Sequence, residues 1–466
     1  MIMETMNYNN KKILIAGLGY RTGLASGNFL AGRGAQVSIT DTKSREDLAP
    51  VIEKLDSSVK VIAGNQDPSL LDEGYELVVL SPGVPQRIPL IREAQKRGIP
   101  VISEIELAYR HARGNIIAIT GTDGKSTTTA LTGHILRELG FDARVGGNIG
   151  IPFISLVDDM TDDTISVIEL SSFQLETVVS FRPDAAAILN VTPDHLDRYD
   201  SIDEYYSAKL RIAMNQNRTD TFLYNMDDAV LAAGFGRIAA KQISFSYDNK
   251  KADAYCDRDY IYIRYADNLI QCLDTARLQI LGAHNVLNTM AAILLVLAVM
   301  GKRLEKPDFN AIAHACYSFR GLAHRMEKLG EYEGRTFIND SKATTVGALE
   351  MALRSFPGNI VLILGGRTKG DDYSRLSPSM KKRVKSLVLI GESSQSFGSI
   401  FHDFSPAAAG SLDEAVVIAM RTSGRGDIVL LSPACASFDM FTSYEDRGDS
   451  FRRSFEKLQR GELSWT

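Results

Sequence analysis

Residues 119–129 read ITGTDGKSTTT and follow an apolar, strand-like run. A glycine turn after a strand, with a lysine at the start of the next helix, favours phosphate, because loop amides, helix dipole and ammonium group all attract an anion. The usual phosphate loop, G-x-x-x-x-G-K-[ST], has four residues between its glycines, whereas only two separate Gly121 from Gly124. Ser126 or Thr127 offers a hydroxyl to Mg²⁺. The stretch therefore predicts a nucleotide-binding loop of shortened spacing.

The size and composition of the chain exclude several classes of protein. Its 466 residues predict two to four domains at roughly 100–200 residues each. A net charge of −5 gives no reason to expect binding to nucleic acid or to a membrane surface. The longest apolar run, residues 290–300, is about half a membrane span and favours a buried helix. The N-terminus lacks a signal-peptide pattern and the four cysteines are widely separated, so we expect a cytoplasmic protein with free thiols.

The first segment of about 110 residues has the order strand, glycines, helix, strand, acid. The glycines lie in GLGYRTG at 17–23, and Asp41 ends the second strand. A dinucleotide fingerprint would read G-x-G-x-x-G, but here the third glycine comes one residue late. Two interpretations remain: an NAD site, or another anion held by amides at a helix N-terminus. In either case Asp41 is placed to accept hydrogen bonds from a ribose or a base.

The second segment carries polar residues where apolar strands end. Glu169 closes the strand-like run 164–170, and His195 follows the run 185–191. A carboxylate at such a position is either paired within the protein or directed at a metal ion. Since the carboxyl ends of parallel strands share one edge of a sheet, Lys125, Ser126 and Glu169 are expected on the same side. That shared edge favours a metal-dependent nucleotide site.

The alternation of strands and helices predicts an α/β fold of three domains. We expect a Rossmann-like N-terminal domain at 1–112, a central P-loop-type ATPase domain with a mostly parallel sheet at 113–320, and a Rossmann-like C-terminal domain at 321–466. Short strands within 241–281 form an excursion of the central domain. By their local sequence alone, Lys209 and the charges around residues 325–342 resemble ordinary helix and loop residues.

Taken together, the motifs resemble the Mur ligases, ATP-dependent amide-forming enzymes of peptidoglycan synthesis, over nearly the whole chain. The loop with two residues between its glycines is similar to the Mur-type ATP loop, which folylpolyglutamate synthetases share. Eight further motifs, in order, are similar to the branch of the family that adds D-glutamate: GGNIG (146–150), ELSSFQLE (169–176), NVTPDHLDRY (190–199), AKLRI (208–212), GAHNVLN (282–288), HRME (324–327), NDSKAT (339–344) and LSPACASFDMF (431–441).

The resemblance implies roles for individual residues at the nucleotide and metal sites. Lys125, His195 and Lys209 would be catalytic. Two Mg²⁺ ions would lie at Ser126, Glu169, His195 and Lys209, with Lys209 carbamylated so that a carboxylate-like group replaces an ammonium that would repel the cations. Residues implied to bind ATP are Gly121, Thr122, Asp123, Gly124, Lys125, Ser126, Thr127, Asn285, Asn288, Arg325 and Asp340.

The resemblance also implies two substrates, UDP-N-acetylmuramoyl-L-alanine and D-glutamate, and a cytoplasmic monomer. The uridine nucleotide would occupy the first domain, which would explain the imperfect dinucleotide fingerprint. Residues implied to contact the substrates are Thr22, Asp41, Thr42, Ser81, Asn148, Lys342, Thr344, Lys369, Ser437, Phe438 and Tyr444. Another amide ligase of this superfamily is the alternative within the enzyme class. A nucleotide-binding regulator without turnover and an NAD oxidoreductase are alternatives from other classes.

Overall fold

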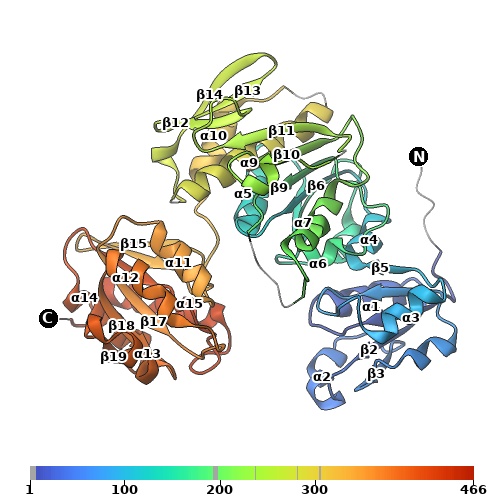
Figure 1. The fold of residues 1–466 in the computed structure, drawn as a ribbon, viewed down its shortest axis with the longest axis horizontal. Helices are drawn as coiled ribbons and strands as arrows, with labels where there is room; N and C mark the ends of the chain where they lie inside the picture. Colours follow the sequence, from blue (N-terminus) through green and yellow to red (C-terminus); the bar gives the residue numbers. More distant parts are fainter. Residues whose placement is uncertain (1–6, 193–197, 237, 281, 304–305, 466) are drawn as a thin grey trace. The chain divides into compact units, whose positions relative to one another are not determined.

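The structure, a computed structural model, describes residues 7–192, 198–236, 238–280, 282–303 and 306–465. In these residues the chain forms three mostly parallel sheets with helices between their strands, which confirms the predicted α/β class (Figure 1). The chain divides into two compact units. Unit 1 comprises the residues up to Ala276 together with Val286–Cys316, and unit 2 comprises Arg277–Asn285 and the residues from Tyr317 onward.

Unit 1 begins with a five-stranded parallel sheet in the order β3-β2-β1-β4-β5. Its central strands are short apolar runs buried on both faces, as expected when helices cover both sides of a parallel sheet. The strands are β1 (Lys12–Ala16), β2 (Gln36–Asp41), β3 (Lys60–Ala63), β4 (Leu77–Leu80) and β5 (Val101–Ser103). The α-helices between and after them are α1 (Thr22–Ala31), α2 (Arg45–Ile52), α3 (Pro89–Lys96) and α4 (Glu104–Tyr109).

Unit 1 continues with a nine-stranded sheet in the order β14-β13-β12-β11-β10-β9-β6-β8-β7. The sheet is parallel from β7 to β12, and the predicted excursion adds the antiparallel strands β13 and β14 at one edge. The strands are β6 (Asn115–Thr120), β7 (Ala143–Gly147), β8 (Ile165–Glu169), β9 (Ala185–Ile188), β10 (Thr221–Asn225), β11 (Lys241–Ser246), β12 (Ala254–Asp257), β13 (Tyr260–Tyr265) and β14 (Asn268–Asp274). The accompanying helices are α5 (Lys125–Glu138), α6 (Ser172–Leu175), α7 (Ile202–Leu210), α8 (Ala229–Ala232), α9 (Ala283–Lys302) and α10 (Phe309–Ser318).

Helix α9 contains the most apolar stretch of the chain. Among the described residues it alone is long and apolar enough to cross a membrane, yet 78% of its apolar window is buried inside the protein. This burial agrees with the core helix predicted from the sequence. At its end, the Nζ of Lys302 donates to Asp184 and Asp220, each at 2.6 Å, and so ties the helix to the sheet.

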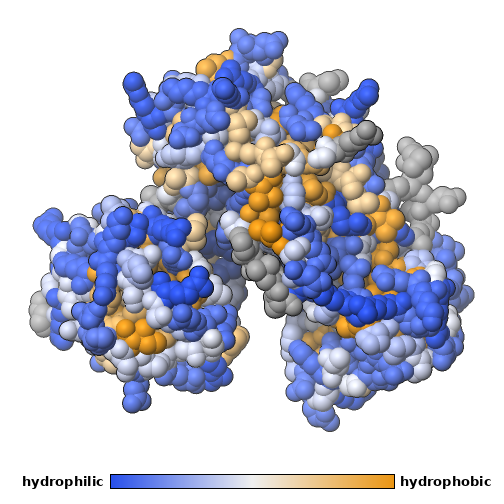
Figure 2. Space-filling model, in the orientation of Figure 1, coloured by the Kyte–Doolittle hydropathy of each residue, from blue (hydrophilic) through white to orange (hydrophobic). Residues whose placement is uncertain are grey.

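Unit 2 holds a six-stranded sheet in the order β15-β16-β20-β17-β18-β19, in which only β15 runs antiparallel to its neighbour. Alternate residues of β17 enter different apolar clusters, so the sheet has a core on each face. The strands are β15 (Glu327–Tyr332), β16 (Arg335–Asn339), β17 (Ile360–Gly365), β18 (Val384–Ile390), β19 (Ala407–Ala409) and β20 (Ile428–Leu431). The helices are α11 (Val346–Arg354), α12 (Ser377–Arg383), α13 (Ser394–Ile400), α14 (Leu412–Thr422) and α15 (Tyr444–Gln459). On the face drawn in Figure 2, hydrophilic residues dominate the surface and apolar ones gather only in small patches.

Candidate active site

The loop between β6 and α5 has the geometry of an anion site. Gly124 adopts a φ of +81°, and a Cβ there would lie 2.4 Å from the Oδ1 of Asn288, so no other residue fits without displacement. The Oδ1 of Asn190, beyond the end of β9, accepts from the amides of Thr122 (3.0 Å) and Asp123 (2.8 Å). The loop is therefore held in shape from a neighbouring strand end. The sequence placed Asn190 at that end but gave no sign that it supports the loop.

Two lysines converge on one carbonyl of this loop. The Nζ atoms of Lys125 and Lys209 donate to the oxygen of Gly121 at 2.9 and 2.8 Å, and Lys125 also donates to the oxygen of Thr122 at 2.6 Å. Lys209 is 1% exposed, with its Nζ 4.3 Å from the centre of the Tyr205 ring. Such a concentration of positive charge attracts a polyphosphate. It would repel a divalent cation unless the charge of Lys209 were removed or reversed.

Glu169 ends β8 at the carboxyl edge of the same sheet, next to β6. In the parallel register it pairs with Ile119 of β6 on one side and Gly147 of β7 on the other. Its carboxylate is 2% exposed; Oε1 accepts from the Nδ2 of Asn148 at 2.9 Å, and Oε2 has no hydrogen-bond partner among the described residues. Buried carboxylate oxygens are normally paired, so this atom suits a cation.

The donor chemistry of this edge fits Mg²⁺. The part of the chain that the structure describes contains no group of three or more His, Cys, Asp or Glu side chains that could hold a metal ion. Mg²⁺ does not require one, because it keeps several waters and takes few protein ligands. The buried hydroxyl of Ser126, in the first turn of α5, and the Oε2 of Glu169 are oxygen ligands of the kind it prefers. The predicted ligand His195 lies outside the described residues.

Helix α9 contributes amides beside the loop. Asn285 and Asn288 are both buried and lie three residues apart, which places them on one face of the helix. The Oδ1 of Asn288 accepts from the hydroxyl of Thr128 in α5 at 3.2 Å. Unit 1 thus places Asn288 next to the loop between β6 and α5.

The residues predicted to hold a uridine nucleotide gather at the carboxyl edge of the five-stranded sheet. The carboxylate of Asp41 accepts from the amides of Leu18 (2.8 Å) and Lys43 (3.0 Å), and the hydroxyl of Ser81 donates to the oxygen of Gly17 at 2.7 Å. Thr22 begins α1, and the exposed Thr42 follows β2. A helix N-terminus suits the phosphates of a nucleotide, and a carboxylate at the same sheet edge suits its ribose or base.

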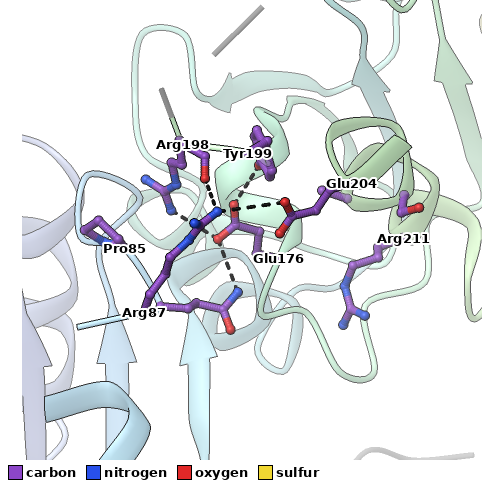
Figure 3. A pocket seen from close by; sticks show the side chains of 10 residues that line it. Pro85, Arg87, Glu176, Arg198, Tyr199, Glu204 and Arg211 are labelled. Atoms are coloured by element: carbon purple, nitrogen blue, oxygen red, sulfur yellow. Dashed lines mark hydrogen bonds and ion pairs between the residues drawn. The ribbon is translucent and has the colours of Figure 1, made fainter. Parts of the chain in front are cut away.

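A cavity of about 380 Å³ adjoins this edge, between the loop after Ser81 and the central domain (Figure 3). Glu176 lies at its centre and accepts from Gln86 (3.2 Å), Arg198 (3.1 Å) and Tyr199 (2.6 Å). Burial and the Glu176 carboxylate together raise the pKa of Tyr199. Arg198 also donates to the oxygen of Pro82 at 2.7 Å, which anchors the loop that carries Ser81.

In unit 2, the buried Asp340 lies near the half-buried Arg325. The Oδ2 of Asp340 accepts from the hydroxyl of Ser432 at 2.8 Å, and burial raises the pKa of this carboxyl to about 7. The nearby positive charge of Arg325 opposes the rise. The Nε of Arg325 is buried without a hydrogen-bond partner among the described residues, so this donor suits an anionic ligand.

Four of the other predicted residues of unit 2 form two contacts between separate loops. The Nζ of Lys342 lies 5.6 Å from the centre of the Tyr444 ring, and the Nζ of Lys369 donates to the hydroxyl of Thr344 at 3.2 Å. Two lysines and a hydroxyl are suitable partners for the carboxylates of an amino acid. Ser437 is buried, whereas its neighbour in the sequence, Phe438, is 64% exposed.

Arg447, which lies in none of the predicted motifs, connects two loops of this region. Its guanidinium is 1% exposed and donates to the hydroxyl and carbonyl of Ser341 (2.9 and 2.8 Å) and to the carbonyl of Cys435 (3.1 Å). Burial lowers the pKa of Arg447 to about 10. The side chain therefore fixes the two loops that carry Lys342 and Ser437. Nothing in its helical sequence context distinguishes it from a surface arginine.

The chain is similar to known proteins along its whole length. Three family models match it: Mur ligase MurD-like, N-terminal domain (residues 11–103), Mur ligase middle domain (119–296) and Mur ligase, glutamate ligase domain (324–435). A UDP-N-acetylmuramoylalanine–D-glutamate ligase of Acidobacterium capsulatum is 42% identical over 465 residues, 99% of each chain. The enzyme of the same name from Geobacter metallireducens is 42% identical over 459 residues, 98% of this chain and all of that protein.

Solved structures agree on the fold. The UDP-N-acetylmuramate-alanine ligase of Thermotoga maritima superposes with a TM-score of 0.57 at 21% identity, covering 97% of this chain and 99% of that one. The MurF ligase of the same organism, solved with ADP, gives 0.56 at 16% identity, covering 98% and 99%. The chain thus shares its fold with these ligases over nearly its whole length.

This chain belongs to the Mur ligase family. It is accordingly an ATP-dependent enzyme that forms amide bonds in peptidoglycan synthesis, as the motifs indicated.

Proposed function

We propose that this ligase joins D-glutamate to UDP-N-acetylmuramoyl-L-alanine, with the release of ADP and phosphate. The observation that carries the proposal is the edge of the nine-stranded sheet, which holds the phosphate loop, Lys125, Lys209 and the Oε2 of Glu169, an atom without a hydrogen-bond partner among the described residues. The names and the 42% identity of the nearly full-length relatives support D-glutamate as the amino acid. The lysine pairs of unit 2 supply charges suited to its two carboxylates.

The reaction follows from the chemistry of these residues. A carboxylate is a poor acyl donor, so the L-alanyl carboxylate first attacks the γ-phosphorus, a C–O–P bond forms, and the bond to ADP breaks. Lys125 releases its two loop carbonyls and pairs with the phosphoryl oxygens, whose charge it neutralises by position rather than by covalent chemistry. The amine of D-glutamate then attacks the acyl carbon and phosphate departs.

Mg²⁺ would be held by Ser126 and Glu169, and it supplies neutralisation of the phosphoryl charge. Asn148 holds the Oε1 of Glu169, so that Oε2 remains directed away from this amide. Lys209 would be carbamylated, because a buried ammonium beside Lys125 opposes a divalent cation. His195 keeps its predicted catalytic and metal-binding role, and Asn285, Asn288, Arg325 and Asp340 keep their predicted roles in binding ATP.

The remaining assignments follow the same proposal. Residues 1–112 would hold the uridine nucleotide, 113–320 would bind ATP, and 321–466 would bind the amino acid. We expect the enzyme to act in the cytoplasm, since its UDP-linked substrate and ATP are cytoplasmic metabolites. We also expect it to be a monomer. Residues that would contact the two substrates are Thr22, Asp41, Thr42, Ser81, Asn148, Lys342, Thr344, Lys369, Ser437, Phe438 and Tyr444.

The deciding experiment measures ADP release with UDP-N-acetylmuramoyl-L-alanine while the amino acid is varied. Release that requires both the acceptor and D-glutamate, and is not supported by L-glutamate, is the expected result. A folate acceptor tests the folylpolyglutamate alternative in the same assay. Release without either substrate would contradict a ligase, and release with another amino acid would refute the D-glutamate assignment.

Lys125→Ala tests the phosphate role within this assay. We expect ligation to fall to background while the thermal midpoint stays close to that of the wild type, because the half-buried side chain donates to carbonyls of the loop, those of Gly121 and Thr122. Lys250→Ala is the matched control, since Lys250 is exposed and pairs only with Asp257 among the described residues. Near-normal turnover by folded Lys125→Ala would contradict the role.

A further inference from the structure

The glycine turn of the first domain contains a residue whose side chain does not cap the helix that follows. In GLGYRTG the third glycine is displaced by one position, and Arg21 occupies the position before α1. Helices usually begin after a side chain that caps their first amides, such as Ser, Thr, Asp or Asn. Arg21 makes no such bond, and its φ and ψ of −114° and −89° are not those of a regular cap. Its side chain is directed elsewhere.

The guanidinium of Arg21 leaves the first domain and binds the loop between β7 and β8. Nη1 donates to the oxygen of Asn148 at 3.0 Å, and Nη2 donates to the oxygens of Gly147 (3.0 Å) and Gly150 (2.9 Å). Gly147 and Gly150 adopt φ values of +95° and +57°, which the loop needs in order to bring these carbonyls together. One planar cation thus holds three acceptors within four consecutive residues.

The same loop supports the proposed metal ligand. The amide of Asn148 donates to the oxygen of Glu169 at 2.8 Å, and its Nδ2 donates to Oε1 at 2.9 Å. The amide of Gly147 donates to the oxygen of Ile151 at 2.8 Å, which closes the turn. The main chain that Arg21 holds is therefore the main chain that aims Asn148 at Glu169.

A second charged side chain holds the continuation of this loop. Glu104, at the start of α4, is 1% exposed and accepts from the amide of Ile154 at 2.6 Å. The positive charge of Arg21 lies close enough to oppose the effect of burial on the Glu104 carboxyl. Residues 147–154 are thus held at one end by Arg21 and at the other by Glu104, and both of these residues precede the central sheet in the sequence.

We propose that Arg21 is a positioning residue: by holding the carbonyls of Gly147, Asn148 and Gly150, it keeps the Asn148 amide on Glu169 and couples the first domain to the metal site. The inference rests on the proposed role of Glu169 as a Mg²⁺ ligand. Arg21 thereby becomes part of the surroundings of the proposed Mg²⁺ site. Loss of Arg21 should weaken the metal-dependent steps while the protein still folds.

The test compares Arg21→Ala and Arg21→Lys with Arg33→Ala as the matched control. Arg33, also of the α1 region, pairs with Asp158 and lies over the Phe29 ring but makes no bond to residues 147–150. For Arg21→Ala we expect the Mg²⁺ concentration for half-maximal activity to rise about 10–100-fold, the range for residues that orient metal ligands. Arg33→Ala is expected to match the wild type. Free guanidinium at millimolar concentration should partly restore Arg21→Ala, and Arg21→Lys should fall in between.

Amide hydrogen exchange gives a readout that does not depend on turnover. In Arg21→Ala the amides of Gly147 and Asn148 should exchange faster, while the thermal midpoint shifts by no more than it does in Arg33→Ala. Unchanged exchange with unchanged Mg²⁺ dependence would overturn the proposal. A higher KM for the UDP substrate alone would also overturn it, since Arg21 would then contact that substrate. Normal Mg²⁺ dependence in Glu169→Gln would instead refute the metal assignment, whatever Arg21 does.

Discussion

Replacing Glu104 by glutamine should make the stability of unit 1 less sensitive to alkaline pH. The Glu104 carboxyl is buried; Oε1 accepts from the amide of Ile154, whereas Oε2 has no hydrogen-bond partner among the described residues. Burial disfavours the charged form and raises the pKa of this group from 4.5 to about 7. Glutamine keeps the shape and the Oε1 acceptor but cannot ionise.

The sign and size of the effect follow from proton linkage. Because the folded-state pKa of Glu104 lies above its unfolded value, the folded protein holds an extra proton between about pH 4.5 and pH 7. Stability from this group is therefore fully present below about pH 4.5 and is lost as the pH rises through 7. A shift of roughly 2.5 units at 1.36 kcal/mol each gives a loss on the order of 3 kcal/mol.

The assay is thermal unfolding of wild type and Glu104→Gln at pH 5 and pH 8.5. At pH 5 the two proteins should unfold at similar temperatures, because both side chains are largely neutral in the folded protein and each leaves its N–H or O–H donors unsatisfied at the Oε2 position. At pH 8.5 the variant should gain up to about 3 kcal/mol in the transition of unit 1, which corresponds to several degrees for a domain of this class. The same difference at both pH values would refute the reasoning, as would a less stable variant at pH 8.5.

Three further substitutions test other contacts. Lys209→Ala should lose at least about tenfold in activity, with partial rescue by a short carboxylic acid; full activity without rescue would contradict the carbamate. Gly147→Ala places a Cβ 2.3 Å from the main-chain oxygen of Glu169 at a φ of +95°. We expect the free energy of unfolding to fall by about 1–3 kcal/mol, and kcat to fall with it. Gly150→Ala shares the positive φ (+57°) but has open space around it, so it is the control for backbone strain without the clash. Lys302→Met removes two charge-assisted bonds and should lower the urea-unfolding free energy by about 2–3 kcal/mol, with little effect on KM.

Most of the fold could be predicted because its signals are local. Apolar runs of four to seven residues, followed by glycines and helical patterns, predicted all five strands of the first sheet, several of the second, four of the third and the core helix α9, whereas β7, β10 and β19 were not predicted. The antiparallel strand β15 was not anticipated, because its alternation of exposed and half-buried residues resembles a polar loop. The two lysines predicted to be catalytic, Glu169 and Asn288 were singled out from motif positions, and the structure brings these residues of unit 1 to one sheet edge.

The sequence by itself determined the class of the protein, the order of its elements and the residues whose chemistry is distinctive. Ammonium, carboxylate and glycine positions are visible in the letters of the loop GTDGKST. The tertiary structure alone decided which groups support them: Asn190 under the loop amides, Arg447 beneath the loops of unit 2, and Arg21 across 126 to 129 residues to the loop of Asn148. Most of these partners are main-chain amides and carbonyls, which every residue carries. A contact to such a group leaves no sequence signature, so only the packing of the chain reveals it.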